Sequence, residues 1–149
     1  MSHDAPAVGM LLDEVVLDIE PGKIREFARA TGALDPAHTA AESARGLAAP
    51  LATLTHSVAV GHLRDQQKFV EALGLDIRRV VVGEVAWHYA RPLLAGDRLR
   101  ASRRVIADEE RDGSSGAMRL VTLETELVDE SGAIAATVRE VLIERRGGK

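Results

Sequence analysis

The 149-residue chain contains no cysteine, which excludes disulfide bonds and thiolate metal sites and fits a reducing compartment. Aromatic residues are scarce, with two phenylalanines, one tryptophan and one tyrosine. The hydrophobic core is therefore expected to consist of Val, Leu, Ile and Ala side chains. The N-terminal segment lacks both a basic region and a long apolar run, so the sequence predicts no secretory signal.

Long apolar runs and an excess of positive charge are also missing. No apolar stretch approaches the roughly 20 residues of a membrane-spanning helix, so no membrane partner is expected. The formal net charge of −4 argues against a nucleic-acid partner. Without cysteine or a His-Glu-x-x-His pattern, we expect no metal site, and nothing in the sequence calls for a cofactor. Together these features predict a cytoplasmic protein.

The length corresponds to one domain, spanning residues 1–149, with flexible ends at 1–10 and 146–149. The first half has the apolar periodicity and the end signals of helices. Pro21 suits a first helical position, and Asp35 before Pro36 is typical of an N-cap. We expect three helices: Pro21 to Gly32, Asp35 to just before Gly46, and a long apolar helix from about Leu51 to Leu73.

The second half changes to alternating polarity, which is typical of strands. For example, Val121 and Leu123 fall on one face of a strand and Thr122 on the other. We expect strands at Glu14–Ile19, Arg78–Tyr89, Arg98–Ala107, Met118–Val128 and Ala133–Ile143. Strands clustered after helices predict an α+β domain with an antiparallel sheet, one face of which is buried by the long helix. Either Trp87 or His88 faces that helix, and the alternation alone leaves the choice open.

Three segments, in this order, carry a resemblance to a known family: Phe27–His38 (FARATGALDPAH), Gly46–Thr55 (GLAAPLATLT) and Gly83–Asp97 (GEVAWHYARPLLAGD). Together they resemble the MaoC-like dehydratases, over about residues 10–145. The resemblance implies a hot-dog fold, in which a long central helix is wrapped by an antiparallel sheet. It also implies pairing of such domains, as a homodimer or as a heterodimer with a second hot-dog subunit.

The resemblance further implies an activity: hydration or dehydration of trans-2-enoyl and (R)-3-hydroxyacyl thioesters, with an acyl-CoA or acyl-carrier-protein thioester as the ligand. Catalytic relatives carry Gly-Asp-x-Asn-Pro-x-His in the first segment. Here His38 fills the histidine position, Asp35 the asparagine position and Ala33 the aspartate position. Alanine performs no acid–base chemistry, so His38 and Asp35 are the candidate catalytic residues.

Each candidate also has a plain structural interpretation. Asp35 is either a base or simply the N-cap of the short helix. His38 is either the acid–base group or a solvated loop histidine. Leu51 and Ala52, at the start of the long helix, are candidate substrate-binding residues because helix N-termini offer unpaired N–H groups to an enolate. Thr55 is the third candidate, as a hydroxyl facing the site or as an ordinary helical threonine.

Three functions follow as hypotheses. The first is an enoyl-thioester hydratase or 3-hydroxyacyl-thioester dehydratase. The second, favoured by Ala33, is a non-catalytic acyl-binding subunit whose partner supplies the catalytic pair. The third is a hot-dog thioesterase, which ranks last because the helix between Leu51 and Arg64 has no carboxylate. A basic cluster either steers a phosphorylated carrier or is a solvated strand face: Arg98, Arg100, Arg103 and Arg104.

Overall fold

The computed structural model describes residues 8–39, 51–52, 60–61, 63–114 and 116–146. Its core is one five-stranded antiparallel sheet in the order β1-β3-β4-β5-β2. The strands are β1 (Leu11–Asp18), β2 (Val80–Tyr89), β3 (Arg98–Gly113), β4 (Gly116–Val128) and β5 (Ile134–Arg146). The strands β1 and β2 form the two edges. Every strand expected from the alternating pattern is present.

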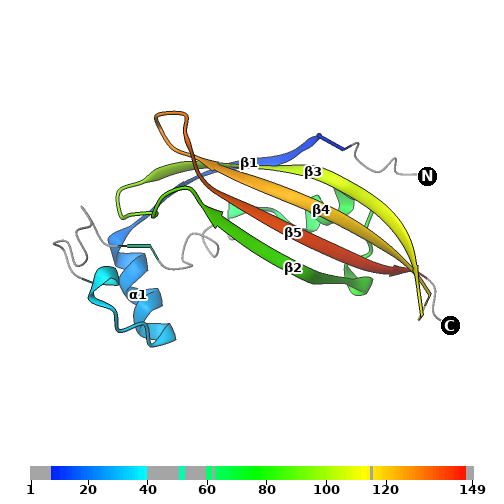
Figure 1. The fold of residues 1–149 in the computed structure, drawn as a ribbon, viewed down its shortest axis with the longest axis horizontal. Helices are drawn as coiled ribbons and strands as arrows, with labels where there is room; N and C mark the ends of the chain where they lie inside the picture. The colour runs from blue at the N-terminus through cyan, green and yellow to red at the C-terminus, as the bar shows by residue number, and fades with distance from the viewer. Residues whose placement is uncertain (1–7, 40–50, 53–59, 62, 115, 147–149) are drawn as a thin grey trace.

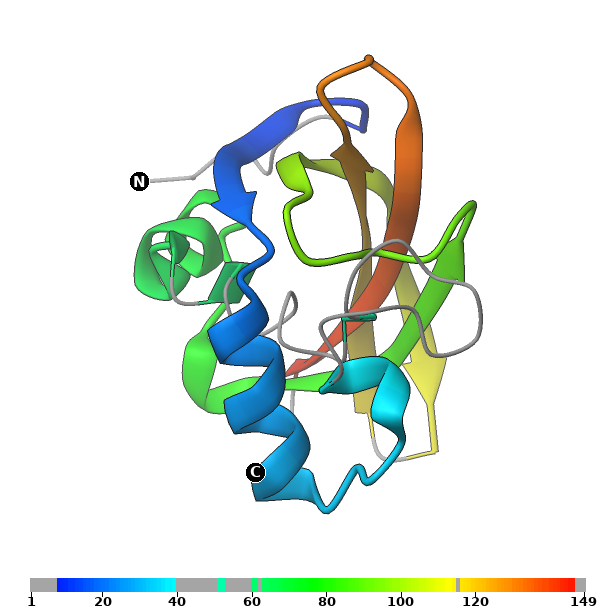
Figure 2. The same ribbon diagram turned by 90° about the vertical axis from the view of Figure 1, so that its left-hand side faces the viewer.

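The helical elements are α1 (Pro21–Thr31), the 3₁₀ turn η1 (Pro36–His38), α3 (Gln66–Ala72) and the 3₁₀ turn η3 (Ile77–Arg79). Figure 1 shows α1 beyond one end of the long sheet. In the end view of Figure 2, the strands curve around the side on which α3 lies. The first helix begins at Pro21 and stops at Gly32, whose left-handed φ of 68° suits glycine. Both ends agree with the sequence pattern.

One face of the sheet is buried, and it is the face that alternation predicts. Leu99, Ala101 and Val105 of β3 are fully buried, as are Val121 and Leu123 of β4. One apolar cluster joins Val60 and α1 to residues of β1, β3, β4 and β5, and a second packs α3 against β3, β4 and β5. The core is almost entirely aliphatic, as the scarcity of aromatic residues predicts.

The expectation of one uninterrupted helix from Leu51 to Leu73 was wrong at its start and at Arg64, although α3 ends at Ala72 with Leu73 as its C-cap. Leu51 lies in a β-bridge with Leu94, not in a helix. The chain is helical at 60–61 and 63, bends at Arg64, and starts again as α3 because Asp65 caps the Lys68 N–H at 3.0 Å. Residues 53–59, where the middle of the expected helix falls, are outside the described residues.

The strand ends also differ from expectation. β3 continues to Gly113, and β4 begins at Gly116, so the hairpin between them is longer than the alternating apolar pattern indicates. Arg146, expected to begin a flexible C-terminal end, still pairs with Ala117 in the sheet, and the rest of that end lies outside the described residues. At the other end, the Gly9 N–H donates to the Val105 carbonyl at 2.7 Å, which ties part of the expected N-terminal arm to β3.

The structure of strand β2 shows which of Trp87 and His88 faces the inside of the fold. Trp87 is half-buried against the apolar cluster around Val60, whereas His88 is exposed. The Trp87 ring stacks on Tyr89, with centroids 5.9 Å apart, so the two aromatic residues share the inner face of the sheet.

Candidate functional site

His38 lies at the end of a short turn held together by Asp35. The Asp35 carboxylate accepts a hydrogen bond from the Ala37 N–H at 3.0 Å, and the His38 N–H donates to the Asp35 carbonyl at 3.0 Å. Asp35 is therefore an N-cap, as its place before Pro36 predicts. Ala37 is buried and anchors the turn, while the His38 ring is half-buried.

The His38 ring is held by the backbone of a distant segment. Its Nδ1 lies 2.8 Å from the Leu51 carbonyl oxygen. A carbonyl oxygen only accepts, so Nδ1 carries the hydrogen. In the neutral imidazole, Nε2 then holds the lone pair, which is the form a general base requires.

The Leu51–Ala52 backbone is fixed on both sides. The Leu51 N–H donates to the Ala37 carbonyl at 2.7 Å, and the Ala52 N–H donates to the Leu93 carbonyl at 2.8 Å. Both N–H groups are thus occupied, which corrects the expectation that they are unpaired donors at a helix start. What Leu51 provides to the site is its carbonyl oxygen. Thr55 lies outside the described residues.

The loop that supports Ala52 is held by an ion cluster. Arg91 pairs with Asp97 through two hydrogen bonds, of 2.7 and 3.3 Å, and with Asp129 at 3.2 Å. The two carboxylates raise the Arg91 pKa, chiefly through the Asp97 hydrogen bond. The pKa of Asp129 is lowered to about 2, first by the Ser131 hydroxyl and also by Arg91. The Gly83–Asp97 segment thus ends in a turn that is also held by the ion pairs of Arg91 with Asp97 and Asp129.

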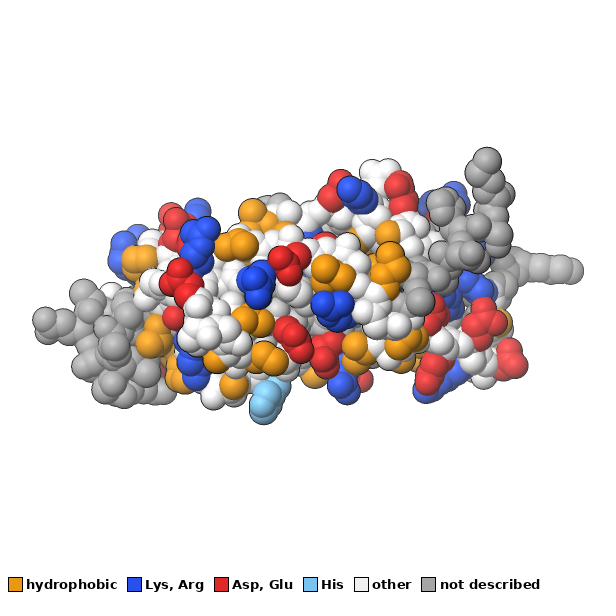
Figure 3. Space-filling view, turned by 90° about the horizontal axis from the view of Figure 1, so that it is seen from above, with side chains coloured by type: hydrophobic (Ala, Val, Ile, Leu, Met, Phe, Trp, Pro, Cys, Tyr) orange, Lys and Arg blue, Asp and Glu red, His pale blue; other side chains and the backbone are white. Residues whose placement is uncertain are grey.

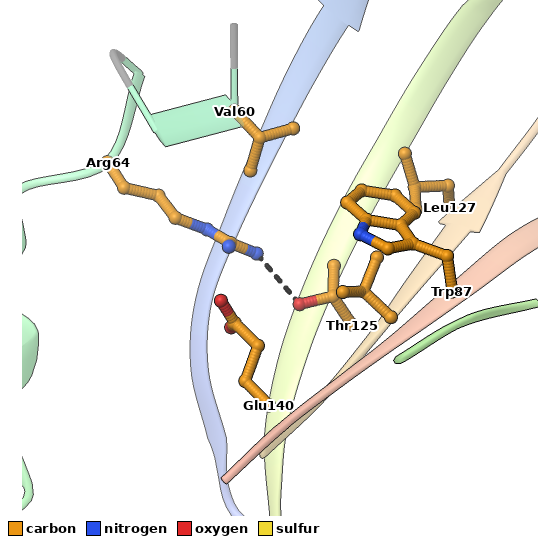
Figure 4. A pocket seen from close by; sticks show the side chains of 7 residues that line it. Val60, Arg64, Trp87, Thr125, Leu127 and Glu140 are labelled. Atoms are coloured by element: carbon orange, nitrogen blue, oxygen red, sulfur yellow. Dashed lines mark hydrogen bonds between the residues drawn. The ribbon is translucent and has the colours of Figure 1, made fainter. Parts of the chain in front are cut away.

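A small cavity of about 30 Å³ lies against the inner face of the sheet. Figure 4 shows Arg64 and Glu140 on one side of it and Trp87 and Leu127 on the other, with Thr125 next to Trp87 and facing Arg64. Arg64 Nη2 donates to the Thr125 hydroxyl at 3.1 Å. The cavity therefore has an apolar wall and a polar wall.

The polar wall continues into a buried ion cluster. Arg64 Nε lies 3.2 Å from an Asp13 carboxylate oxygen, and Arg103 pairs with the other Asp13 oxygen. The Arg103 guanidinium also lies 4.0 Å from the Phe69 ring centroid, a cation–π distance. Burial lowers the Arg64 pKa to about 10, and Arg103 adds to this shift while Asp13 and Glu140 oppose it.

The four arginines of the basic cluster on β3 do not lie on one face of the sheet. The Arg103 side chain is only 3% exposed, whereas Arg98 and Arg100 pair with Asp18 and Glu14 on the outer face. Arg104 donates to the Gly9 carbonyl. The proposed steering patch is thereby divided between two faces, and on the face in Figure 3 side chains of both signs are interspersed.

Sequence reasoning missed the inner polar residues Arg64, Arg103, Asp13, Thr125 and Glu140. A signal existed for Arg103, because Leu99, Ala101, Arg103 and Val105 share one strand face by alternation. No comparable pattern marks Asp13 or Arg64, since their pairing depends on β1 and the bent helix meeting over the sheet.

Among the described residues, no group of three or more His, Cys, Asp or Glu side chains is placed to hold a metal ion. Over the same residues, no helix has the length and apolar character needed to cross a membrane.

Comparison with known proteins agrees with this architecture. A MaoC-like dehydratase structure covers 92% of this chain and 42% of its own chain at 22% identity, with a TM-score of 0.76. The 3R-hydroxyacyl-ACP dehydratase complex HadBC from Mycobacterium tuberculosis covers 93% of this chain and 98% of the compared chain at 24% identity, with a TM-score of 0.75. The fold is the hot-dog fold of the MaoC-like dehydratases, as the sequence resemblance implies.

The sequence comparison assigns the chain to a protein family. The chain belongs to the family of the FAS1-like dehydratase domain region, whose model matches residues 6–138. A UPF0336 protein from Clavibacter michiganensis subsp. michiganensis is 40% identical over 126 residues, which cover 83% of this chain and 82% of the relative.

Proposed function

We propose that this chain acts on thioesters of coenzyme A or acyl carrier protein, hydrating trans-2-enoyl groups or dehydrating (R)-3-hydroxyacyl groups. The observation that carries the proposal is the hydrogen bond from His38 Nδ1 to the Leu51 carbonyl. It leaves the lone pair of the neutral ring on Nε2. The dehydratase family and the similarity to a 3R-hydroxyacyl-ACP dehydratase support the substrate class.

In the hydration direction, His38 Nε2 accepts a proton from water while the water oxygen bonds to C3 of the enoyl group. The electron pair of the double bond moves to the thioester as an enolate. The imidazolium then returns its proton to C2, which completes the addition of water. Asp35 contributes by capping the turn that carries His38. Thr55 stays a candidate for contact with the thioester.

A second candidate function is favoured by Ala33. Its N–H donates to the Ala28 carbonyl at 2.8 Å and completes the end of α1, but its methyl side chain offers no proton acceptor. This favours a subunit that binds the acyl thioester while a partner hot-dog subunit supplies the catalytic pair. The HadBC structure is a complex of hot-dog dehydratase chains, which supports this alternative.

The substitution Ala33→Asp separates the two functions. If the chain is a weakened enzyme, the restored carboxylate is expected to raise the hydration rate of crotonyl-CoA or longer enoyl-CoA substrates. The rise should fall within the range of about 10²–10⁴-fold typical of one acid–base group. The measurement is the loss of enoyl absorbance over several chain lengths, with Ala33→Asn as the control that adds similar volume without the charge.

No turnover by either the native chain or Ala33→Asp, together with measurable acyl-CoA binding by calorimetry, would establish the binding-subunit alternative. Neither turnover nor binding over the tested chain lengths would rule out both functions.

We also propose that a second hot-dog subunit pairs along strand β2. This 10-residue strand is an edge of the sheet in the described part of the chain, where its neighbouring strand is β5. Val85 and Tyr89 lie opposite Glu140 and Ala136 of β5, so their side chains are on the inner face. They are nevertheless 49% and 42% exposed. Exposed apolar side chains on an edge strand are a surface that a paired subunit can cover.

Light scattering is expected to give twice the 16.0 kDa chain mass at micromolar concentration. Val85→Lys should shift the mass to that of the monomer, because a lysine on the open edge opposes pairing. The matched control is Val16→Lys, since Val16 is 47% exposed on the opposite edge strand. A monomeric native chain, or equal dissociation by both substitutions, would show that β2 is not the pairing edge.

A further inference from the structure

The loop from Arg91 to Asp97 is built around one carboxylate. Asp97 Oδ2 accepts from Arg91 Nη1 at 2.7 Å and from the Leu94 N–H at 2.9 Å. Asp97 Oδ1 accepts from Arg91 Nη2 at 3.3 Å. The Asp97 N–H donates to the Leu94 carbonyl at 3.1 Å, which closes the loop on itself. The side chain of Asp97 thus fixes both the arginine and the backbone of Leu94.

The same loop holds the segment that contacts His38. Leu94 forms the β-bridge with Leu51, and the Leu93 carbonyl accepts from the Ala52 N–H at 2.8 Å. The Leu93 side chain is 2% exposed and lies in the same apolar cluster as Val60. The position of the Leu51 backbone is therefore set from the loop side by groups that Asp97 immobilises.

On its other side, Leu51 holds the histidine turn by two contacts. Its N–H donates to the Ala37 carbonyl at 2.7 Å, and its carbonyl oxygen lies 2.8 Å from His38 Nδ1. A chain of contacts thus runs from the Asp97 carboxylate to the Leu94 N–H, across the Leu51–Leu94 bridge with its Ala52–Leu93 hydrogen bond, and from the Leu51 carbonyl to the imidazole. Each link includes at least one backbone group, so a displacement of the loop is transmitted to the ring.

We propose that Asp97, paired with Arg91, is a positioning residue for His38: it fixes the Leu51 carbonyl that selects the Nδ1–H tautomer of the ring. The role of this tautomer in catalysis rests on the proposed function, but the positioning itself is a structural property that can be measured without turnover. Arg91 takes part because two nitrogens of its planar guanidinium contact the two oxygens of Asp97 and fix the orientation of the carboxylate.

The test is Asp97→Asn, followed by the ring-nitrogen chemical shifts of protein labelled at histidine. The His38 signals are identified by their absence in His38→Ala. The native chain is expected to show His38 as the single Nδ1–H tautomer. Asp97→Asn should give a mixture of tautomers, because the amide cannot accept from Arg91 and Leu94 at all three contacts. Where turnover is present, kcat should fall about tenfold or more, with a smaller change in KM.

The matched control is Asp108→Asn. Asp108 also binds one arginine with both oxygens, Arg119 at 2.9 and 2.7 Å, but beside Leu73 at the end of α3. Asp108→Asn should lower the free energy of unfolding without changing the His38 signals or kcat. Arg91→Lys is the milder second variant should Asp97→Asn fail to fold, and it should also broaden the tautomer distribution.

Asp97→Glu restores the carboxylate and is expected to recover part of the native tautomer population. A folded Asp97→Asn or Arg91→Lys protein that keeps the single Nδ1–H tautomer would overturn the proposal. So would an equal change caused by Asp108→Asn. If the native chain shows no turnover, the catalytic proposal fails while the tautomer measurement still decides the positioning role.

Discussion

Replacing His38 with alanine is expected to lower kcat/KM for enoyl-CoA hydration by about 10²–10⁴-fold, the range for a lost general acid–base group. In the proposed reaction, His38 is the group that accepts and returns the proton, because the position where catalytic relatives carry aspartate is occupied by Ala33. The His38 ring is also held at Nδ1 by the Leu51 carbonyl, so its Nε2 is oriented and not free to rotate.

The matched control is His88→Ala. His88 is exposed on the strand that carries Trp87, but it faces away from the inner side of the sheet. Its removal should leave the rate unchanged, and urea unfolding of both variants checks that neither has lost stability. A His38→Ala protein with native turnover would exclude His38 from the reaction.

The largest stability effect is expected for Asp13→Ala. Asp13 contacts both Arg64 and Arg103, whose side chains are only 7% and 3% exposed. Removing the carboxylate leaves two like charges buried next to each other. Breaking such a buried pair costs about 3–5 kcal/mol of unfolding free energy, which urea denaturation measures directly.

The control for Asp13→Ala is Asp18→Ala on the same strand. Asp18 pairs with Arg98, and these side chains are 59% and 55% exposed, so the expected loss is at most about 1 kcal/mol. The triple change Asp13→Leu, Arg64→Met and Arg103→Met should recover much of the stability, because it removes the buried charges together. Equal losses for Asp13→Ala and Asp18→Ala would show that the buried cluster is not stabilised by Asp13.

Features coded over a few neighbouring residues were predictable. Alternation placed Val121 and Leu123 on the buried face, and Pro21 and Gly32 marked the ends of α1. Asp35 was identified as an N-cap from its place before Pro36, and the structure has this cap, although on the 3₁₀ turn Pro36–His38 in place of the start of the expected helix. His38 came from the family resemblance, and the structure adds the contact that orients it.

Features that depend on contacts between distant segments were not predictable. The apolar periodicity of 50–73 suits a helix, yet Leu51 joins a β-bridge because Leu94 is brought beside it. The helix also bends at Arg64, where the Asp65 cap begins α3. A helical pattern records the preference of a segment alone, and tertiary hydrogen bonds override it at these two points.

The sequence by itself determined the antiparallel sheet, its buried face, the aliphatic core and the capped turn of His38, because each depends on propensities and side-chain alternation within a short segment. The tertiary structure alone decided that the Leu51 carbonyl meets His38, that Leu94, whose N–H binds Asp97, lies beside Leu51, and that Arg64 and Arg103 share Asp13 inside the fold. These contacts join residues up to 90 positions apart. Their geometry is set only when the strands and the bent helical segment pack together.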